Sequence, residues 1–178
     1  MVLAPDCFRQ QLLAAIPRLR RYARSLVLDT GSADDVVQNT LERALAHWHQ
    51  YDQRRDMVLW LLSIAHNAFL DARRRESRSL ATDPSDLTQQ LDAIGGDPGV
   101  DVGLRLDLAA ALGRLSPEQR EPLLLVTLEQ LSYAECAEVL GIPIGTVMSR
   151  ISRARAALRL LLDGKARTDG AATLRREV

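Results

Sequence analysis

Hydrophobic residues recur at helical spacing in three segments of the first half of the chain. Residues 8–28, 33–49 and 57–76 each carry an apolar side chain every three or four positions, as amphipathic helices do. The polar stretch 29–32 interrupts this pattern, and Ser32 is predicted to N-cap the second helix. The spacing predicts burial of Phe8, Leu12, Ile16, Leu19, Tyr22 or Ala23, Leu26, Val36 or Val37, Thr40, Leu41, Ala44 or Leu45, Trp48, Leu59, Leu62, Ala65 and Phe69.

The second half of the chain carries helix start and stop signals. Ser116 precedes a proline, with a glutamine at the third position after the serine, which predicts a capped helix start. Ser132 and Glu135 have the spacing of a second capping box, and Gly141 is typical of the residue that ends a helix. A last helix is predicted from about residue 145 to about residue 162.

The charges are distributed unevenly along the chain. The net charge of the 178 residues is zero, but residues 1–78 and 108–178 are both mildly basic. Residues 79–107 carry six Asp and one Arg in a context rich in Ser, Thr, Gly and Pro, as linkers are. We therefore predict a helical domain over 1–78, a flexible acidic linker over 79–104, a second helical domain over 105–165 and a disordered tail over 166–178.

The composition favours an all-α protein. Hydrophobic residues make up 47% of the chain, and the abundant Leu, Ala and Arg are strong helix formers. The sequence has neither a secretory leader nor an apolar run near the ~18 residues of a membrane span, so a cytoplasmic protein without membrane insertion is expected. The cysteines Cys7 and Cys136 fit free thiols, and Cys136 is predicted to lie in the core.

Residues 133–152 have the pattern of a helix-turn-helix. This motif needs a small residue in its first helix, a residue that tolerates a left-handed backbone in the turn, and an apolar residue inside its second helix. Ala137, Gly141 and Val147 meet these needs. The outer face of the second helix is left with hydroxyl and guanidinium groups, which suit phosphates and base edges in a major groove. An ordinary helical hairpin with a solvated basic face is the alternative.

The sequence offers no constellation for catalysis. It lacks a phosphate-binding Gly loop, a nucleophile elbow and a metal-binding cluster, so we expect no enzyme, no catalytic residue, no cofactor and no metal site. His47 and His49 would point about 200° apart on a helix and could not share one ion. Glu135 and Glu138 are interpreted as solvated helix surface.

Two blocks of sequence resemble the extracytoplasmic-function (group IV) sigma factors of the sigma-70 family. Residues 33–44, ADDVVQNTLERA, are similar to region 2.2 of that family, and residues 60–75, WLLSIAHNAFLDARRR, to regions 2.3 and 2.4. Similarity to region 4 is found in the segments 115–125, 131–141 and 145–158. The blocks stand in the family's order with a linker between them, which is a more specific signal than a helix-turn-helix alone.

The resemblance implies two roles for the first block. In the family, region 2.2 docks on a coiled coil of the largest polymerase subunit. The resemblance implies that the corresponding docking residues in this chain are Asp34, Asp35, Gln38, Asn39 and Glu42. Regions 2.3 and 2.4 hold unstacked bases of the minus-10 element. The implied minus-10 residues are Tyr51, Gln53, Arg54, Arg55, His66, Asn67, Arg73, Arg74 and Arg75, with Asp52 and Asp56 in the same loop. A solvated polar face is the alternative for the docking residues, and Trp60 is open between a core and a stacking role.

By the same resemblance, the last helix would read the minus-35 element. The implied residues are Thr146, Met148, Ser149, Arg150, Ser152, Arg153 and Arg155. Met148 departs from the family, which often has a basic residue there, so apolar contact would replace a charged hydrogen bond. The acidic linker would thread through the polymerase near the RNA exit path, or act as a solubilising tether.

The sequence therefore predicts an alternative sigma factor with core RNA polymerase, promoter DNA and an anti-sigma factor as partners. It would recognise minus-35 and minus-10 elements and initiate transcription of a stress, envelope or metal-type regulon. The rivals are a stand-alone helix-turn-helix regulator and a sigma mimic that sequesters an anti-sigma factor. The basic residues at 73–75 and 150–155 count against the mimic, because a mimic does not need to face DNA.

Overall fold

The computed structural model describes residues 4–78 and 102–173. Within these ranges the chain forms seven α-helices and one 3-10 helix, with no strand. The predicted all-α class is therefore confirmed. The linker prediction for 79–101 and the tail prediction for 174–178 lie outside the described residues. No helix in the described ranges has the combination of length and hydrophobicity that crossing a membrane requires.

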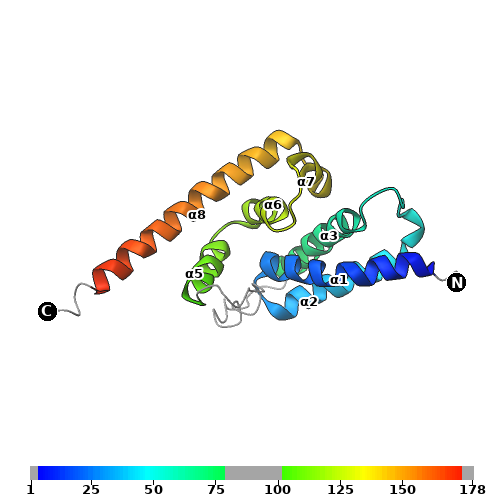
Figure 1. The fold of residues 1–178 in the computed structure, drawn as a ribbon, viewed down its shortest axis with the longest axis horizontal. Helices are drawn as coiled ribbons and strands as arrows, with labels where there is room; N and C mark the ends of the chain where they lie inside the picture. The colour runs from blue at the N-terminus through cyan, green and yellow to red at the C-terminus, as the bar shows by residue number, and fades with distance from the viewer. Residues whose placement is uncertain (1–3, 79–101, 174–178) are drawn as a thin grey trace.

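The N-terminal half is a bundle of three long helices. It consists of α1 (Asp6–Val27), α2 (Thr30–Ala46), the 3-10 helix η1 (Trp48–Gln50) and α3 (Met57–Arg78). Helices α1 and α2 run side by side, and α3 packs against both of them (Figure 1). At three pairs of neighbouring positions, the spacing did not decide which of the two side chains is buried. Tyr22 with Ala23 and Val36 with Val37 are buried together, whereas Ala44 is buried and Leu45 is 46% exposed.

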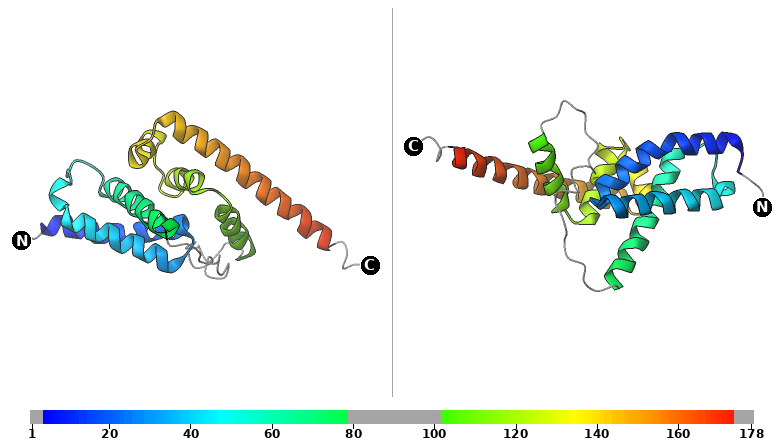
Figure 2. Two further views of the ribbon diagram at one scale, coloured as in Figure 1. Left: turned by 180° about the vertical axis from the view of Figure 1, so that it is seen from behind. Right: turned by 90° about the horizontal axis from the view of Figure 1, so that it is seen from below.

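The C-terminal half consists of three short helices and one long one. They are α5 (Val102–Gly113), α6 (Pro117–Thr127), α7 (Tyr133–Leu140) and α8 (Ile144–Thr173). Helix α8 packs on α5, α6 and α7 near its start and then extends away from the rest of the molecule (Figure 2). The predicted end near residue 162 is wrong, because the helix continues to Thr173. A single glycine such as Gly164 costs a helix only about 1 kcal/mol relative to alanine, which does not end it.

The two halves pack against each other and share one core. Helix α6 lies against α1, and α7 lies against α3. The shared core joins Leu19, Tyr22, Leu26, Leu62 and Phe69 of the first half to Leu125, Cys136, Val139, Val147 and Ile151 of the second. A second cluster around Phe8, Leu12 and Leu61 lies at the other end of the three-helix bundle. The two halves are therefore joined by a continuous apolar core.

Two of the predicted helix starts agree with the structure in position, and one differs. Ser132 and Glu135 form the predicted capping box at the start of α7. At the start of α6, Ser116 occupies the cap position but makes no side-chain cap hydrogen bond. Helix α2 begins earlier than predicted: its N-cap is Asp29, whose Oδ2 accepts a hydrogen bond from the Ser32 amide at 2.7 Å. Asp29 rather than Ser32 caps the helix, because its carboxylate accepts from a backbone amide of the first turn that has no partner within the helix.

The two candidate caps of α2 can be separated by mutation. We expect Asp29→Ala to lower the free energy of unfolding by about 1 kcal/mol, because an uncapped helix start loses roughly that amount. Ser32→Ala should change it far less, since Ser32 contributes its backbone amide and not its hydroxyl. Urea unfolding of both variants measures the difference. Equal losses in the two variants would contradict the Asp29 cap.

The two cysteines should differ sharply in reactivity. Cys7 is exposed, whereas Cys136 is fully buried and its Sγ lies 3.9 Å from the Pro122 carbonyl oxygen. Burial, together with the Glu121 charge, raises the pKa of the Cys136 thiol to about 12. We expect iodoacetamide at pH 8 to label Cys7 and spare Cys136 in the native protein, and to label both in urea. Mass spectrometry of tryptic peptides gives the result, and native labelling of Cys136 would refute the assigned core position.

Candidate nucleic-acid interface

The helix-turn-helix of α7 and α8 forms as its sequence predicts. Gly141 ends α7 with φ 62°, in the left-handed region that glycine tolerates. The Ile142 amide donates to the Ala137 carbonyl at 3.2 Å, which closes the turn. Val147 is completely buried at the start of α8. The small residue, the turn glycine and the inner apolar residue therefore hold α8 across α7 with its polar face outward.

The side chains predicted to read the minus-35 element lie on the outer surface of α8. Met148, Ser149, Ser152, Arg153 and Arg155 are exposed, whereas Thr146 and Arg150 are half-buried. The Arg153 Nη2 donates to the Ser149 Oγ at 3.4 Å, so the guanidinium is held along the helix.

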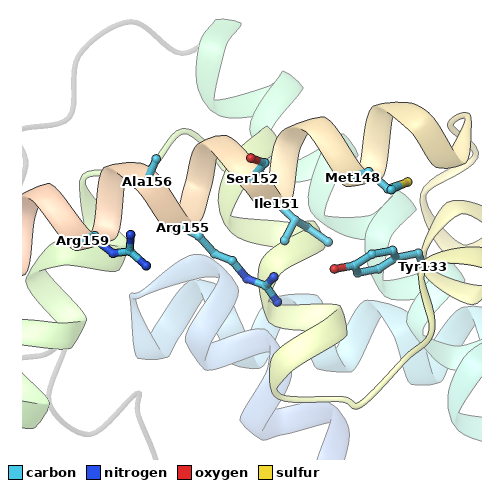
Figure 3. Close-up of a pocket in the computed structure, with 7 residues that line it drawn as sticks. All are labelled: Tyr133, Met148, Ile151, Ser152, Arg155, Ala156 and Arg159. Atoms are coloured by element: carbon cyan, nitrogen blue, oxygen red, sulfur yellow. The ribbon is translucent and has the colours of Figure 1, made fainter.

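A groove of about 350 Å³ runs along this surface (Figure 3). It brings the predicted Met148, Ser152 and Arg155 together with two residues that the sequence analysis missed, Tyr133 and Arg159. Arg159 stands one helical turn beyond Arg155, so helical spacing could have found it. Tyr133 comes from the first turn of α7, and no pattern in α8 points to it. The groove combines an apolar floor with guanidinium groups, which suits contact with both thymine methyl groups and phosphates.

The predicted minus-10 loop is anchored by aromatic rings. Tyr51 lies 5.2 Å from Trp60 and 5.7 Å from Phe8 between ring centroids, and its hydroxyl donates to the Arg55 carbonyl at 2.7 Å. Burial, followed by the charges of Asp56 and Asp52, raises the pKa of the Tyr51 hydroxyl. Trp60 is half-buried within this cluster, which places it in the core of the loop.

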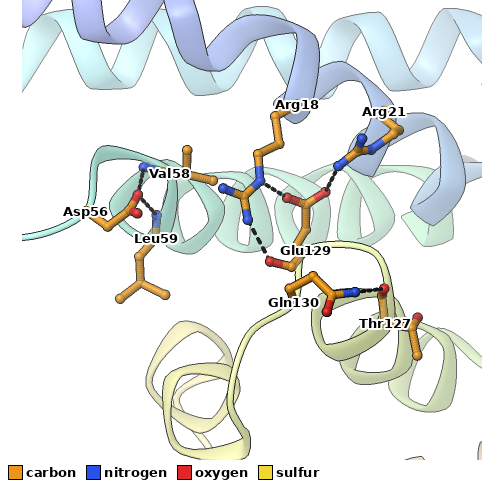
Figure 4. Close-up of polar contacts among 8 residues, drawn as sticks. All are labelled: Arg18, Arg21, Asp56, Val58, Leu59, Thr127, Glu129 and Gln130. Carbon is orange, nitrogen blue, oxygen red and sulfur yellow. Dashed lines mark hydrogen bonds and ion pairs between the residues drawn. The ribbon is translucent and has the colours of Figure 1, made fainter.

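Two carboxylates of this loop serve the backbone. The Asp56 Oδ1 accepts from the Val58 amide at 2.6 Å and the Leu59 amide at 3.4 Å, at the start of α3 (Figure 4). The Asp52 Oδ1 accepts from the Arg54 amide at 3.0 Å. Gln53 and Arg54 remain exposed beside them. The loop is therefore a folded turn that presents its amide and guanidinium groups to solvent.

The basic end of α3 is partly neutralised by its own helix. Arg74 lies 3.8 Å from the Asp71 carboxylate, and Arg75 donates to the Asp71 carbonyl at 3.3 Å. Asp71 also accepts from Arg43 of α2 at 2.7 Å, and this hydrogen bond is the main reason that its pKa is lowered. Asn67 is exposed and donates to the Ser63 carbonyl.

Three of the predicted minus-10 residues contact glutamates of the C-terminal half. Arg55 Nη2 lies 2.6 Å from Glu138 Oε1, and His66 Nδ1 lies 2.8 Å from Glu121 Oε1. Arg73 Nη1 lies 3.7 Å from Glu118 Oε1. Glu138 is exposed, as predicted for helix surface, but it also pairs with a guanidinium 83 positions away in the sequence.

A further buried carboxylate joins the two halves near these contacts. The Glu129 side chain is fully buried between Arg18 and Arg21 of α1 (Figure 4). Arg18 pairs with the carboxylate and also donates to the Glu129 carbonyl at 2.6 Å, while Arg21 lies 3.5 Å from Oε1. The chain presents Glu129 by a tight turn after α6, in which Gln130 takes a positive φ of 58° and donates to the Thr127 carbonyl.

The predicted polymerase-docking residues form an open surface on α2. Asp34, Asp35, Gln38 and Glu42 are exposed and Asn39 is half-buried. Gln38 donates to Glu42 at 3.0 Å, and Arg20 approaches Asp34 to 3.9 Å. This surface carries no contact to the C-terminal half among the contacts described. The described residues also contain no His, Cys, Asp and Glu group that could hold a metal ion.

Comparison with known protein families gives two matches. Residues 105–158 match the model described as sigma-70, region 4. Residues 12–66 match the model described as the sigma2 domain of PhyR. The two matched segments correspond to the two halves of the helical structure.

Curated relatives and solved structures agree with these matches. The chain is 36% identical over 158 residues to the ECF RNA polymerase sigma factor EcfG of Rhodopseudomonas palustris, covering 88% of this chain and 86% of the relative. It is 37% identical over 131 residues to the ECF sigma factor SigC of Mycobacterium tuberculosis, covering 73% and 70%. The sigma factor RpoE of Bartonella quintana, solved with the anti-sigma factor NepR, superposes with a TM-score of 0.76 at 32% identity over 89% of this chain and 98% of that one. The chain therefore belongs to the extracytoplasmic-function sigma factors of RNA polymerase.

Proposed function

We propose that this chain binds core RNA polymerase through the open face of α2 and directs it to promoters with two DNA-facing surfaces. The outer face of α8 reads the minus-35 element, and the loop at 51–56 with α3 holds the minus-10 element. The observation that carries the proposal is the combination, in one chain, of an exposed helix-turn-helix surface and a separate basic, aromatic-anchored loop. A stand-alone helix-turn-helix regulator needs only the first of these.

The proposal includes control by an anti-sigma factor. Two solved relatives support it, because RpoE was solved with NepR and CnrH with the cytosolic domain of CnrY, the latter at a TM-score of 0.62 and 29% identity. Co-purification of the chain with a candidate anti-sigma protein, followed by loss of transcription on its addition, tests this part.

A sigma mimic remains the second candidate, because of one specific observation. The N-terminal half matches the sigma2 domain of PhyR, and the sigma-like part of PhyR was solved in complex with NepR. A mimic would bind an anti-sigma protein and direct no transcription. The exposed arginines of α3 and α8 argue against it, since a mimic has no need of groups that contact DNA.

In vitro transcription with reconstituted holoenzyme tests the proposal and the DNA-facing role of α8 together. We expect promoter-specific initiation by the wild-type chain on a genomic fragment library. Arg153→Ala should reduce it about tenfold, because one lost guanidinium contact to DNA costs roughly 1–3 kcal/mol. The matched control is Arg114→Ala, an exposed arginine in the turn after α5 and outside both surfaces. Absence of initiation by the wild-type chain would overturn the sigma-factor proposal.

The docking face can be tested separately from DNA. Asp35→Ala with Gln38→Ala should weaken binding to core polymerase, measured by fluorescence anisotropy of labelled chain, while leaving helical content unchanged. Its control is Gln10→Ala with Asp163→Ala, which removes the same two kinds of exposed side chain elsewhere. If both double variants bind the polymerase like the wild type, the α2 face is a solvated surface and docking lies elsewhere.

A further inference from the structure

The outer face of α8 has an apolar end and a basic end. Residues spaced three or four positions apart form one stripe along this helix, and they are Met148, Ser152, Arg155 and Arg159. Ile144 extends the stripe by one turn toward the start of α8, and its side chain is 49% exposed. Apolar side chains therefore lie at the N-terminal end of the stripe, and guanidinium groups lie at its C-terminal end.

Met148 presents apolar surface to solvent. Its side chain is 52% exposed, whereas Ile151 of the same helix is almost completely buried. Met148 lines the groove of about 350 Å³ together with Tyr133, whose ring lies alongside this part of α8 (Figure 3). Ser152 follows Met148 by one turn, and its short side chain leaves the groove unfilled. The groove therefore offers apolar surface that the fold itself does not cover.

The arginines of the stripe are available to an external anion. In the part of the chain that the structure describes, neither Arg155 nor Arg159 pairs with a carboxylate, whereas Arg73 of α3 approaches Glu118. Among the described residues that line the groove, none is acidic. The groove therefore combines uncovered apolar surface with unpaired positive charge, which complements a DNA duplex with its phosphates.

A DNA major groove has one apolar group to place against such a surface. Base pairs display hydrogen-bond donors and acceptors there, and the C5-methyl group of thymine is the exception. In a helix-turn-helix, the N-terminal residues of the second helix contact base edges. We propose that Met148, against the ring of Tyr133, selects one base pair of the minus-35 element by the C5-methyl group of its pyrimidine. This inference rests on the proposed DNA-facing role of α8.

The two ends of the stripe then contact different parts of the duplex. Met148 covers the methyl group and removes apolar surface from water, while Arg155 and Arg159 bind phosphates and fix the position of the helix. Ser149 and Arg153 lie on the neighbouring stripe and supply hydrogen bonds to base edges. Because thymine and 5-methylcytosine carry the same C5-methyl group, the groove accepts both and disfavours unmodified cytosine. Methylation of a cytosine at this position would therefore strengthen binding.

Removal of the methyl group alone tests the proposal. The full-length chain first selects its preferred duplex from a pool with a randomised central segment. Each thymine of that duplex is then replaced in turn by deoxyuridine, which lacks the methyl group and keeps the hydrogen-bonding groups. At one position we expect the replacement to weaken binding about three- to fivefold, measured by fluorescence anisotropy at fixed salt, because covering one methyl group contributes roughly that much. At the same position, 5-methylcytosine should bind more tightly than cytosine by a similar factor.

Variants of the full-length chain assign the effect to one side chain. Met148→Ala should bind the thymine and deoxyuridine duplexes with equal affinity, because the contact to the methyl group is lost. Met148→Arg should replace the preference for a methyl group by a preference for guanine, whose N7 and O6 accept from a guanidinium. The matched control is Leu160→Ala, which removes another exposed apolar side chain of α8 outside the groove. It should keep the wild-type ratio of the two affinities.

The result can be separated from that of the proposed function. The proposal is overturned if the wild-type chain selects no sequence, if no thymine is sensitive to replacement, or if the sensitivity persists in Met148→Ala. If the wild-type holoenzyme initiates transcription and no replacement matters, methyl recognition fails and the sigma-factor role stands. If the Met148-dependent effect is found but no holoenzyme initiates, methyl recognition by α8 stands and the sigma-factor role fails.

Discussion

The arrangement of the two halves depends on a carboxylate that has no access to water. Glu129 lies in the tight turn between α6 and α7, and among the residues that the structure describes its charge is paired with Arg18 and Arg21 of α1. A buried carboxylate without cations would cost several kcal/mol, so the turn and α1 must stay together while Glu129 is buried. Because α6 is thereby fixed on α1, α7 comes to lie against α3. The glutamates of α6 and α7 then face basic residues of α3 and of the loop before it.

The basic groups on that face suit two kinds of anion, carboxylates and phosphates. Guanidinium groups bind carboxylates and phosphates with the same geometry, and neither ligand needs a specific sequence around it. What differs is the number of charges presented. Single-stranded DNA offers a phosphate at each nucleotide and stacking bases, whereas α6 and α7 offer three fixed carboxylates near Arg55, His66 and Arg73. The glutamates are held close to the basic groups by the fold, whereas single-stranded DNA would offer a larger number of anionic groups.

Local features of this molecule could be predicted from sequence, and contacts between distant segments could not. Periodicity located the three long helices of the N-terminal half, and capping signals located the starts of α6 and α7. The pattern of Ala137, Gly141 and Val147 predicted the helix-turn-helix, because such signals depend on neighbours within a few positions. The N-cap of α2 was misassigned because Asp29 and Ser32 are both good capping residues and only the backbone path selects between them. The pairing of Glu138 with Arg55 has no local signature at all. Exposed charges of either kind are indistinguishable from solvated surface until the packing of apolar faces brings them together.

The two surfaces for which DNA binding is proposed depend on different kinds of contact, local ones for α8 and long-range ones for α3. The outer face of α8 is set by its own helix-turn-helix, with Val147, Ile151 and Ala154 buried beneath it, so its accessibility does not depend on α1 or α3. The proposed minus-10 surface, in contrast, includes Arg55, His66 and Arg73, which contact glutamates of the C-terminal half. Since α6 contacts both α1 and α8, the helix that carries Glu118 and Glu121 joins the first helix of the bundle to the second helix of the helix-turn-helix. The two proposed surfaces therefore differ in what sets their exposure: packing within the helix-turn-helix for α8, and contacts between the two halves for the basic residues of α3 and of the loop before it.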